Sequence, residues 1–273
     1  MTCPFFIGKN WIMQDVAVVI LAAGKGTRMK SNRAKVLHEI VGVPMIRYVV
    51  ETALAVVDEV VVVIGHEAEA VRKALTPYQS LRFAVQKEQL GTGHAVVCAI
   101  PEVSTGIQDV VVLCGDTPLI KPTTVRSLID QHRARASRLA LIATKLTEPF
   151  GYGRIVSDEH GNPIRIVEES DASESEKKIL IVNSGTYCIN MAFLKKALAS
   201  LKNDNAQGEF YLTDVVAGAY RDGNPAVVLE INDTIQILGV NTREEMAKAE
   251  KFLQQAINGG DQNPLDFSIR ACL

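Results

Sequence analysis

The sequence predicts an α/β protein in which helices cover both faces of a doubly wound, mostly parallel sheet. Apolar runs rich in β-branched residues, such as 15–23 and 59–65, are typical of strands that are buried on both faces. These runs alternate with segments of helical period, and this order favours parallel strands joined by right-handed crossovers. At 273 residues, the chain can form one large domain or a main domain with a smaller second region.

The first half of the chain alternates regularly between the two kinds of segment. We expect strands at 15–23, 59–65, 81–86, 109–120 and 138–146, and helices at 44–57, 67–75, 91–100 and 121–136. Pro44 suits the first turn of its helix because its fixed φ is helical and no N–H partner is needed there. In such a sheet ligands bind outside the carboxyl ends of the strands, so the loops that follow the strands are the candidate binding loops.

The second half has a different rhythm, which begins after Pro149. A hairpin is expected over 152–170, with its turn at 161–163. Further strands are expected at 179–190, 225–231 and 235–240, with helices at 191–201, within 203–220, and at 242–257, where Thr242 is the expected N-cap. We therefore divide the chain into an extension (1–14), a main domain (15–258, comprising a nucleotide-type sheet in 15–149 and a mixed substrate-binding region in 150–258) and a tail (259–273).

Composition excludes several classes of protein. The formal net charge is only −2 and both signs are interspersed, which argues against a protein that coats nucleic acid or an anionic membrane. A hydrophobic content of 47% is too high for a disordered chain, whereas the apolar runs are too short to span a bilayer. The five cysteines are widely spaced without a CxxC pair, and the N-terminus is a poor signal peptide, so we expect a cytoplasmic protein.

A cluster of positive charge follows the first strand. Five cations fall within residues 25–35, beside Gly24 and Gly26: Lys25, Arg28, Lys30, Arg33 and Lys35. The glycines would let the backbone approach a ligand closely, and Arg28 and Lys35 could bind phosphate oxygens, which suits a polyphosphate. Met29 stands where a Walker A loop and a dinucleotide fingerprint each require glycine. From these residues alone, a solvated basic surface loop is the alternative.

The motifs along the chain, taken together, resemble the sugar-nucleotidyltransferases. LAAGKGTRM…KVLHEIVGVPM is most similar to the opening of the uridylyltransferase domain of the bifunctional N-acetylglucosamine-1-phosphate uridylyltransferases. Further similar motifs are QKEQLGTGHAV at 86–96, GDTPLI at 115–120, YGRIV at 152–156, IVEE at 166–169, VNSGTY at 182–187, NAQGEFYLTDVV at 205–216 and GVNTREE at 239–245. The resemblance implies a Rossmann-like sheet of the nucleotide-diphospho-sugar transferase type.

The resemblance also implies which residues act on the phosphates. Arg28 and Lys35 would stabilise the departing pyrophosphate, and Asp116 and Asn241 would coordinate Mg²⁺. Two protein oxygens suit Mg²⁺, which completes its shell with water and phosphate oxygens. Asp116 follows a buried strand, where an ordinary turn residue is the alternative interpretation.

Nucleotide and sugar positions follow in the same way. The nucleotide would contact Leu21, Ala22, Ala23, Gly24, Gln86, Gly91 and Thr92, with Gln86 and the Gly91 and Ala23 backbones at the uracil, since an amide both donates and accepts. The sugar would contact Gly153, Glu168, Asn183 and Ser184. We expect His94 to pack at a helix start without a catalytic role, and Glu169 and Asp171 to remain in solvent.

The sequence departs from the family pattern at two places. Ala34 stands where the family usually has proline before the lysine, which predicts a looser presentation of Lys35. The bifunctional family also continues into a left-handed β-helix acetyltransferase domain, and no hexapeptide repeat occurs before Leu273. Acetyltransferase activity is therefore not expected of these residues, and the oligomeric state stays open.

The implied reaction joins UTP and N-acetylglucosamine 1-phosphate to give UDP-N-acetylglucosamine, a cell-wall precursor, and pyrophosphate, with Mg²⁺ as cofactor. The expected partners are therefore small molecules. Three alternatives remain from the sequence. The enzyme could use another sugar 1-phosphate or another nucleoside triphosphate. It could be a nucleotide-sugar glycosyltransferase, although CGDTP around Asp116 lacks the Asp-x-Asp pair expected for the metal site of such an enzyme. It could also be a non-catalytic nucleotide-sugar binder.

Overall fold

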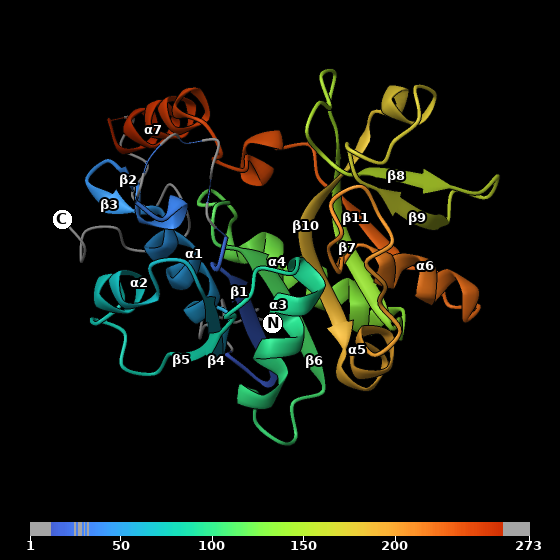
Figure 1. The fold of residues 1–273 in the computed structure, drawn as a ribbon, viewed down its shortest axis with the longest axis horizontal. Coiled ribbons are helices and arrows are strands. Elements are labelled where there is room, and N and C mark those ends of the chain that lie inside the picture. Colours follow the sequence, from blue (N-terminus) through green and yellow to red (C-terminus); the bar gives the residue numbers. More distant parts are fainter. Residues whose placement is uncertain (1–11, 25, 27–28, 30, 32, 259–273) are drawn as a thin grey trace, which may run out of the picture.

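A central mixed sheet organises the molecule (Figure 1). The computed structural model describes residues 12–24, 26, 29, 31 and 33–258, so Arg28 lies outside the described residues. The order of the main path is β11-β7-β10-β6-β1-β4-β5, and β8 and β9 extend it beside β10. The strands are β1 (Met13–Leu21), β4 (Val57–Ile64), β5 (Arg82–Val85), β6 (Asp109–Cys114), β7 (Leu139–Lys145), β8 (Arg154–Ser157), β9 (Pro163–Val167), β10 (Ile181–Asn190) and β11 (Val227–Glu230).

Strands β6, β1, β4 and β5 form the expected parallel half. Val19 of β1 lies beside Val61 of β4 on one side and Val112 of β6 on the other. Because the chain moves from β1 outward to β4 and β5 and then returns to β6, the strand order reverses between β1 and β6. Loops that leave such a reversal point diverge and open a crevice for ligands.

Helices cover both faces of the sheet, which confirms the predicted fold class. They are α1 (Met45–Leu54), α2 (Ala68–Ala74), α3 (Thr92–Ala99), α4 (Pro122–Ala134), α5 (Met191–Leu198), α6 (Asp214–Arg221) and α7 (Arg243–Asn258). Apolar residues of α1, α2 and α4 pack in one core and those of α3, α5 and α6 in another, with alternate β1 residues facing each. Val18 and Val19 illustrate this, since both are fully buried on opposite faces.

The second half makes the sheet mixed. Strand β10 runs antiparallel to both β6 and β7, whereas β11 is parallel to β7. The predicted hairpin is present as β8 and β9, which project beside β10 (Figure 1). The register of β10 against β7 shifts between Asn183 and Tyr187, so β10 is irregular where it passes the crevice.

The predicted strand at 235–240 is wrong. Residues Thr234–Ile237 form a 3-10 turn, η5, in which Gln236 is buried. Its Oε1 accepts from the backbone N–H of Lys121 at 3.2 Å and from Thr124 Oγ1 at 2.7 Å. These bonds fasten η5 to the start of α4, so its backbone joins no sheet.

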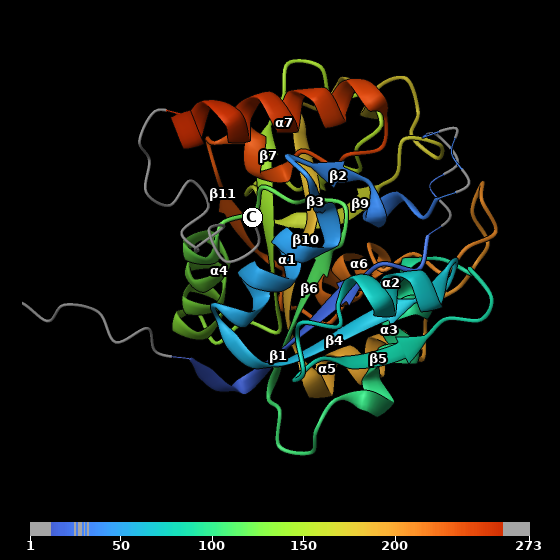
Figure 2. The same ribbon diagram turned by 90° about the vertical axis from the view of Figure 1, so that its left-hand side faces the viewer.

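A third core brings α7 over the first half of the chain. The unpredicted hairpin of β2 (Glu39–Ile40) and β3 (Val43–Pro44) packs with Ala249 and Leu253 of α7. Figure 2 shows α7 crossing above this hairpin. None of the described helices is long and apolar enough to cross a membrane.

Candidate active site

Two adjoining pockets lie at the carboxyl ends of β1 and β6. Each encloses about 230 Å³, and four residues line both of them: Leu21, Thr92, Cys114 and Asp116. The first pocket, which we name the nucleotide pocket after the ligand predicted for its residues, also contains Ala22, Ala23, Gly24, Lys35, Gln86 and Gly91. The second, which we name the sugar pocket for the same reason, contains Gly153, Glu168, Asn183, Ser184 and Asn241. The structure therefore brings together all the predicted site residues that it describes.

The two glycines of the first loop have different surroundings. Gly26 has a φ of +62°, and a Cβ built there would lie 2.5 Å from Lys35 Cβ. Gly24 carries no such strain, and no described atom lies within 4 Å of a Cβ built on it. Gly26 is therefore required by the fold of the loop, whereas Gly24 is a bare stretch of the nucleotide pocket wall.

Ala34 is held firmly, against the expectation of a loose segment. It is fully buried with a φ of −52°, close to the value that proline would impose. Its N–H donates to Glu67 Oε2, and proline could not make this hydrogen bond. The bond to Glu67 thus provides a restraint just before Lys35.

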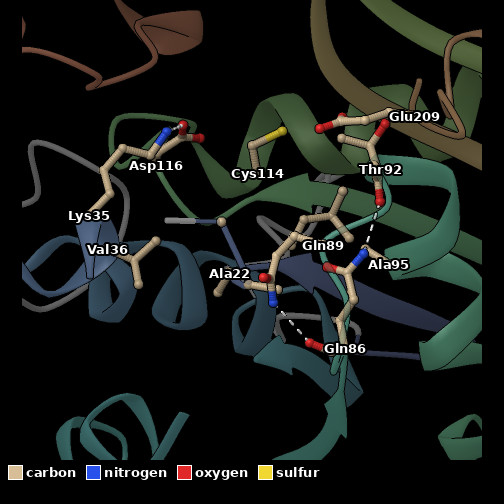
Figure 3. Close-up of a pocket in the computed structure, with 14 residues that line it drawn as sticks. Ala22, Lys35, Val36, Gln86, Gln89, Thr92, Ala95, Cys114, Asp116 and Glu209 are labelled. Atoms are coloured by element: carbon tan, nitrogen blue, oxygen red, sulfur yellow. Dashed lines mark hydrogen bonds and ion pairs between the residues drawn. The ribbon is translucent and has the colours of Figure 1, made fainter. Parts of the chain in front are cut away.

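Gln86 is fixed at the far end of the nucleotide pocket from Lys35 and Asp116 (Figure 3). Its side chain is 3% exposed, and its Nε2 donates to Gly91 O at 3.0 Å and lies 3.1 Å from His94 Nδ1. Because the amide nitrogen is engaged on these two groups, the orientation of the amide is set and Oε1 is the acceptor that a ligand would meet. His94 lies in the first turn of α3, as expected, and its contact helps to orient Gln86.

The glycines of the LGTG motif, Gly91 and Gly93, allow the loop before α6 to pack closely against them. Gly91 has a φ of +105°, and a Cβ there would lie 2.6 Å from Phe210 O. A Cβ on Gly93 would lie 2.4 Å from Leu201 Cδ1. This close packing places Glu209 on the wall of the nucleotide pocket beside Thr92 (Figure 3).

Lys35, Asp116 and Asn241 meet where the two pockets join. Lys35 Nζ donates to Asp116 Oδ2, and it donates to Asn241 Oδ1 at 2.8 Å. The Lys35 and Asp116 side chains are 16% and 20% exposed, so this ion pair is only partly open to water. Val240 N–H also donates to Asp116 O at 2.8 Å, which ties the two distant segments together through the backbone.

This cluster fits a small divalent cation. Two hard oxygens, from Asp116 and Asn241, converge on a single ammonium group, so a cation already stands where they meet. Within the described part of the chain, no group of three or more His, Cys, Asp or Glu side chains is placed to hold a metal. A metal at Asp116 and Asn241 would therefore take its remaining ligands from water and substrate phosphates.

The sugar pocket is lined by buried polar groups. Glu168 Oε1 accepts from Thr213 Oγ1 at 3.2 Å, and burial raises the pKa of this carboxyl. Asn183 is 8% exposed and donates through Nδ2 to Tyr187 Oη at 2.7 Å. A Cβ on Gly153 would lie 2.8 Å from Ile166 Cγ2 and 3.3 Å from Glu168 Oε2, so this glycine allows Glu168 its position.

Glu169 departs from the expectation that it stays in solvent. Its Oε2 accepts from Arg154 at 2.7 Å and from the Gly151 N–H at 3.1 Å. Arg154 is 2% exposed, so a buried guanidinium needs this carboxylate as its partner. The pair holds the backbone of the sugar pocket at Gly151, whereas Asp171 is exposed as expected.

Several residues that line the pockets were not predicted as site residues from the sequence: Gln89, Cys114, Tyr152, Thr213 and Glu209. Four of them belong to motifs that carried the resemblance, so membership in a motif was the available signal. Cys114 directly precedes one of these motifs. Burial, together with the nearby Asp116 carboxylate, raises the pKa of the Cys114 thiol to about 12, so the thiol is neutral at physiological pH.

Comparison with known proteins identifies the family of this chain. Residues 18–209 match the MobA-like NTP transferase domain family. The chain is 46% identical over 247 residues to the bifunctional protein GlmU of Geobacter metallireducens, covering 90% of this chain and 52% of that protein. It is 45% identical over 244 residues to the bifunctional protein GlmU of Desulfotalea psychrophila, covering 89% and 72% respectively.

The chain spans about half the length of the first of these relatives. Among solved structures, the fold is similar to a Bacillus anthracis protein assigned as a glucose-1-phosphate thymidylyltransferase and crystallised with sucrose. The TM-score is 0.71 at 19% identity, with 86% of this chain and 94% of that chain covered.

Proposed function

The chain belongs to the MobA-like NTP transferase family and is a nucleotidyltransferase of the GlmU type, and on this premise we propose that it makes UDP-N-acetylglucosamine and pyrophosphate from UTP and N-acetylglucosamine 1-phosphate. The observation that carries the proposal is the pair of pockets that join at Asp116. One pocket has a fixed amide at its far end, and the other has buried hydrogen-bonding groups. Lys35 lies at their junction.

The nucleotide pocket suits a uracil base. Gln86 Oε1 can accept the N3–H of uracil, whereas the N3 of cytosine carries no hydrogen and would leave this acceptor unpaired. Gly24 leaves room for the ribose and phosphates along the wall. The triphosphate would then extend toward Lys35 and Asp116.

The sugar pocket suits a hexose with several hydroxyl or amide groups. Asn183 is buried and Glu168 is partly buried, and both are already oriented, by Tyr187 and Thr213 respectively. A ligand that lacks the matching polar group would leave these side chains unpaired, and this gives selectivity. A sugar bound there would place its 1-phosphate at the Asp116 junction.

Chemistry at the junction needs positioning and charge neutralisation. A phosphate oxygen of the sugar phosphate attacks the α-phosphorus of UTP, a new P–O bond forms, and the bond from the α-phosphorus to the bridging oxygen breaks to release pyrophosphate. The attacking phosphate is already ionised, so no general base is required. A reaction between two bound substrates held in line is accelerated mostly by their orientation and by fixed positive charge.

Asp116 and Asn241 would hold Mg²⁺, which neutralises phosphate charge and aligns the reacting groups when it is bound. Lys35 donates to both of these oxygens. We infer that Lys35 exchanges these partners for a substrate phosphate, and Arg28 would add a second cation from the same loop.

A pyrophosphate-release assay tests the function. Four nucleoside triphosphates are each paired with N-acetylglucosamine 1-phosphate, glucose 1-phosphate and other hexose 1-phosphates. The proposal expects Mg²⁺-dependent release to be fastest with UTP and N-acetylglucosamine 1-phosphate. Faster release with another pair would reassign the substrates, and binding of nucleotide sugars without release would point to a non-catalytic binder.

A further inference from the structure

A carboxylate on α7 fixes the backbone that presents Asn241. Glu245 Oε2 accepts from the N–H of Asn241 at 2.7 Å and from the N–H of Thr242 at 2.8 Å. The Glu245 N–H donates in return to Thr242 Oγ1 at 3.2 Å. Thr242 and Glu245 thus form a capping box, and the same carboxylate reaches one residue further back, to Asn241.

The side chain of Asn241 is oriented by the same turn. Its Nδ2 donates to Gly239 O at 3.0 Å, and its Oδ1 accepts from Lys35 Nζ at 2.8 Å. The amide therefore turns its oxygen toward Asp116. The bond from Glu245 to the Asn241 N–H holds the backbone from which this amide projects.

Helix α7 provides a rigid frame for Glu245. Ala249 and Leu253, on the following turns, are fully buried against Ile40 and Leu119. The segment before α7 is also bonded to the Asp116 loop, because Val240 N–H donates to Asp116 O. Movement at Glu245 would thus change the position of the Asn241 side chain relative to Asp116.

We propose that Glu245 is a positioning residue for the cation site of Asp116 and Asn241, beyond its role as a helix cap. The inference rests on the proposed function, since it takes Asn241 as a metal ligand. Groups that orient a metal ligand typically change metal affinity about 10–100-fold when they are removed. Glu245 would act on the cation only through Asn241.

Two substitutions separate this role from helix capping. Glu245→Ala removes the carboxylate half of the capping box and also releases the Asn241 N–H. Thr242→Ala removes the hydroxyl half of the capping box but leaves the contact between Glu245 and Asn241 intact. Each breaks part of the same cap, so similar losses of stability are expected. Glu245→Gln keeps an acceptor oxygen and is the conservative rescue.

The readout is binding of UDP-N-acetylglucosamine by calorimetry, with and without Mg²⁺. The ratio of the two dissociation constants measures the coupling between metal and nucleotide sugar. We expect Glu245→Ala to lose most of the Mg²⁺ enhancement while its metal-free affinity stays near that of the wild type. Thr242→Ala and Glu245→Gln should retain the enhancement, and Asn241→Ala should lose it.

Each contrary outcome has a distinct meaning. Equal loss of enhancement in Glu245→Ala and Thr242→Ala would reduce Glu245 to an ordinary cap and overturn the inference. Retention in Glu245→Ala, with loss in Asn241→Ala, would overturn the inference but leave the proposed function standing. No enhancement in the wild-type protein would remove the cation site itself, and the inference would fall with it.

Discussion

Gly24 and Gly26 lie two residues apart, yet the structure predicts opposite consequences for their substitution by alanine. Gly26→Ala places a Cβ 2.5 Å from Lys35 Cβ at a φ of +62°. Gly24→Ala places one in space that no described atom occupies within 4 Å. The first change should damage the fold of the loop, and the second should damage only the pocket.

The magnitude for Gly26→Ala has two parts. An L-residue in left-handed backbone costs about 1–2 kcal/mol. Carbon atoms normally approach to about 3.5–4.0 Å, so the loop or Lys35 must move by about 1 Å, and overpacking of this kind costs about 1–3 kcal/mol. The total of roughly 2–5 kcal/mol corresponds to a fall in Tm of roughly 4–20 °C for a domain of this size.

Gly24→Ala should leave the Tm unchanged or raise it slightly. Alanine lowers the conformational entropy of the unfolded chain, and this stabilises the folded state by about 0.4–1 kcal/mol. The methyl group would instead occupy part of the nucleotide pocket. If overpacking against bound UTP costs about 1–3 kcal/mol, affinity falls about 5–150-fold.

Thermal denaturation and calorimetric titration with UTP and Mg²⁺ measure both effects on the same samples. A stable Gly26→Ala variant would refute the structural role of Gly26. Wild-type affinity in Gly24→Ala would show that no nucleotide approaches this wall.

Three further changes test other parts of the site. Asp116→Ala should lower turnover about 10²–10³-fold, with a smaller effect on sugar phosphate affinity, and near-normal turnover in steady-state kinetics would dismiss its role at the reacting phosphates. Burial raises the pKa of Glu168 in the folded state, so its contribution to stability is greatest below the unfolded pKa of about 4.3 and is lost as pH rises through the folded pKa. Glu168→Gln removes this pH-dependent loss of stability, so the Tm of the variant minus that of the wild type should increase from pH 5 to pH 7. The affinity for the sugar should fall in the same variant. A Tm difference that does not change with pH would contradict the raised pKa of Glu168. His132 is 3% exposed and bonds Asp109 Oδ1 at 3.2 Å at the opposite end of β6. His132→Ala should cost about 2–4 kcal/mol in urea denaturation, because it leaves a buried carboxylate with one fewer partner, but turnover should not change; a loss of turnover in the folded variant would connect this network to the site.

The parallel half of the sheet was predictable because its strands bury both faces. Such strands read as unbroken apolar runs, and the intervening helices show a clear period. The direction of β10 was not predictable, since an antiparallel strand between two buried neighbours has the same composition as a parallel one. The run at 235–240 is apolar although it does not join a sheet. It contains part of η5, which is held against the start of α4 by hydrogen bonds of the buried Gln236.

The residues of the candidate site, and the pairing of Asp116 with Asn241, were predicted by resemblance, but the contact of Lys35 with both was not. Asp116 and Asn241 come from segments far apart in the chain, and only the fold shows that Lys35 contacts both. Ala34 stands where the family has proline, and this suggested a loose segment. The hydrogen bond that restrains Ala34 instead comes from Glu67, on a separate loop, so the sequence around Ala34 gave no sign of it. Local patterns report backbone preference and burial, and they carry no information about such long-range hydrogen bonds.

A crystal structure with UDP-N-acetylglucosamine and Mg²⁺ would show whether the two pockets hold the nucleotide and the sugar as proposed. We expect uracil against Gln86, the sugar between Glu168 and Asn183, Mg²⁺ bound by both Asp116 and Asn241, and Lys35 turned away from these oxygens toward a phosphate. A nucleotide sugar in the reverse orientation, or a metal bound elsewhere while Lys35 keeps both partners, would contradict it.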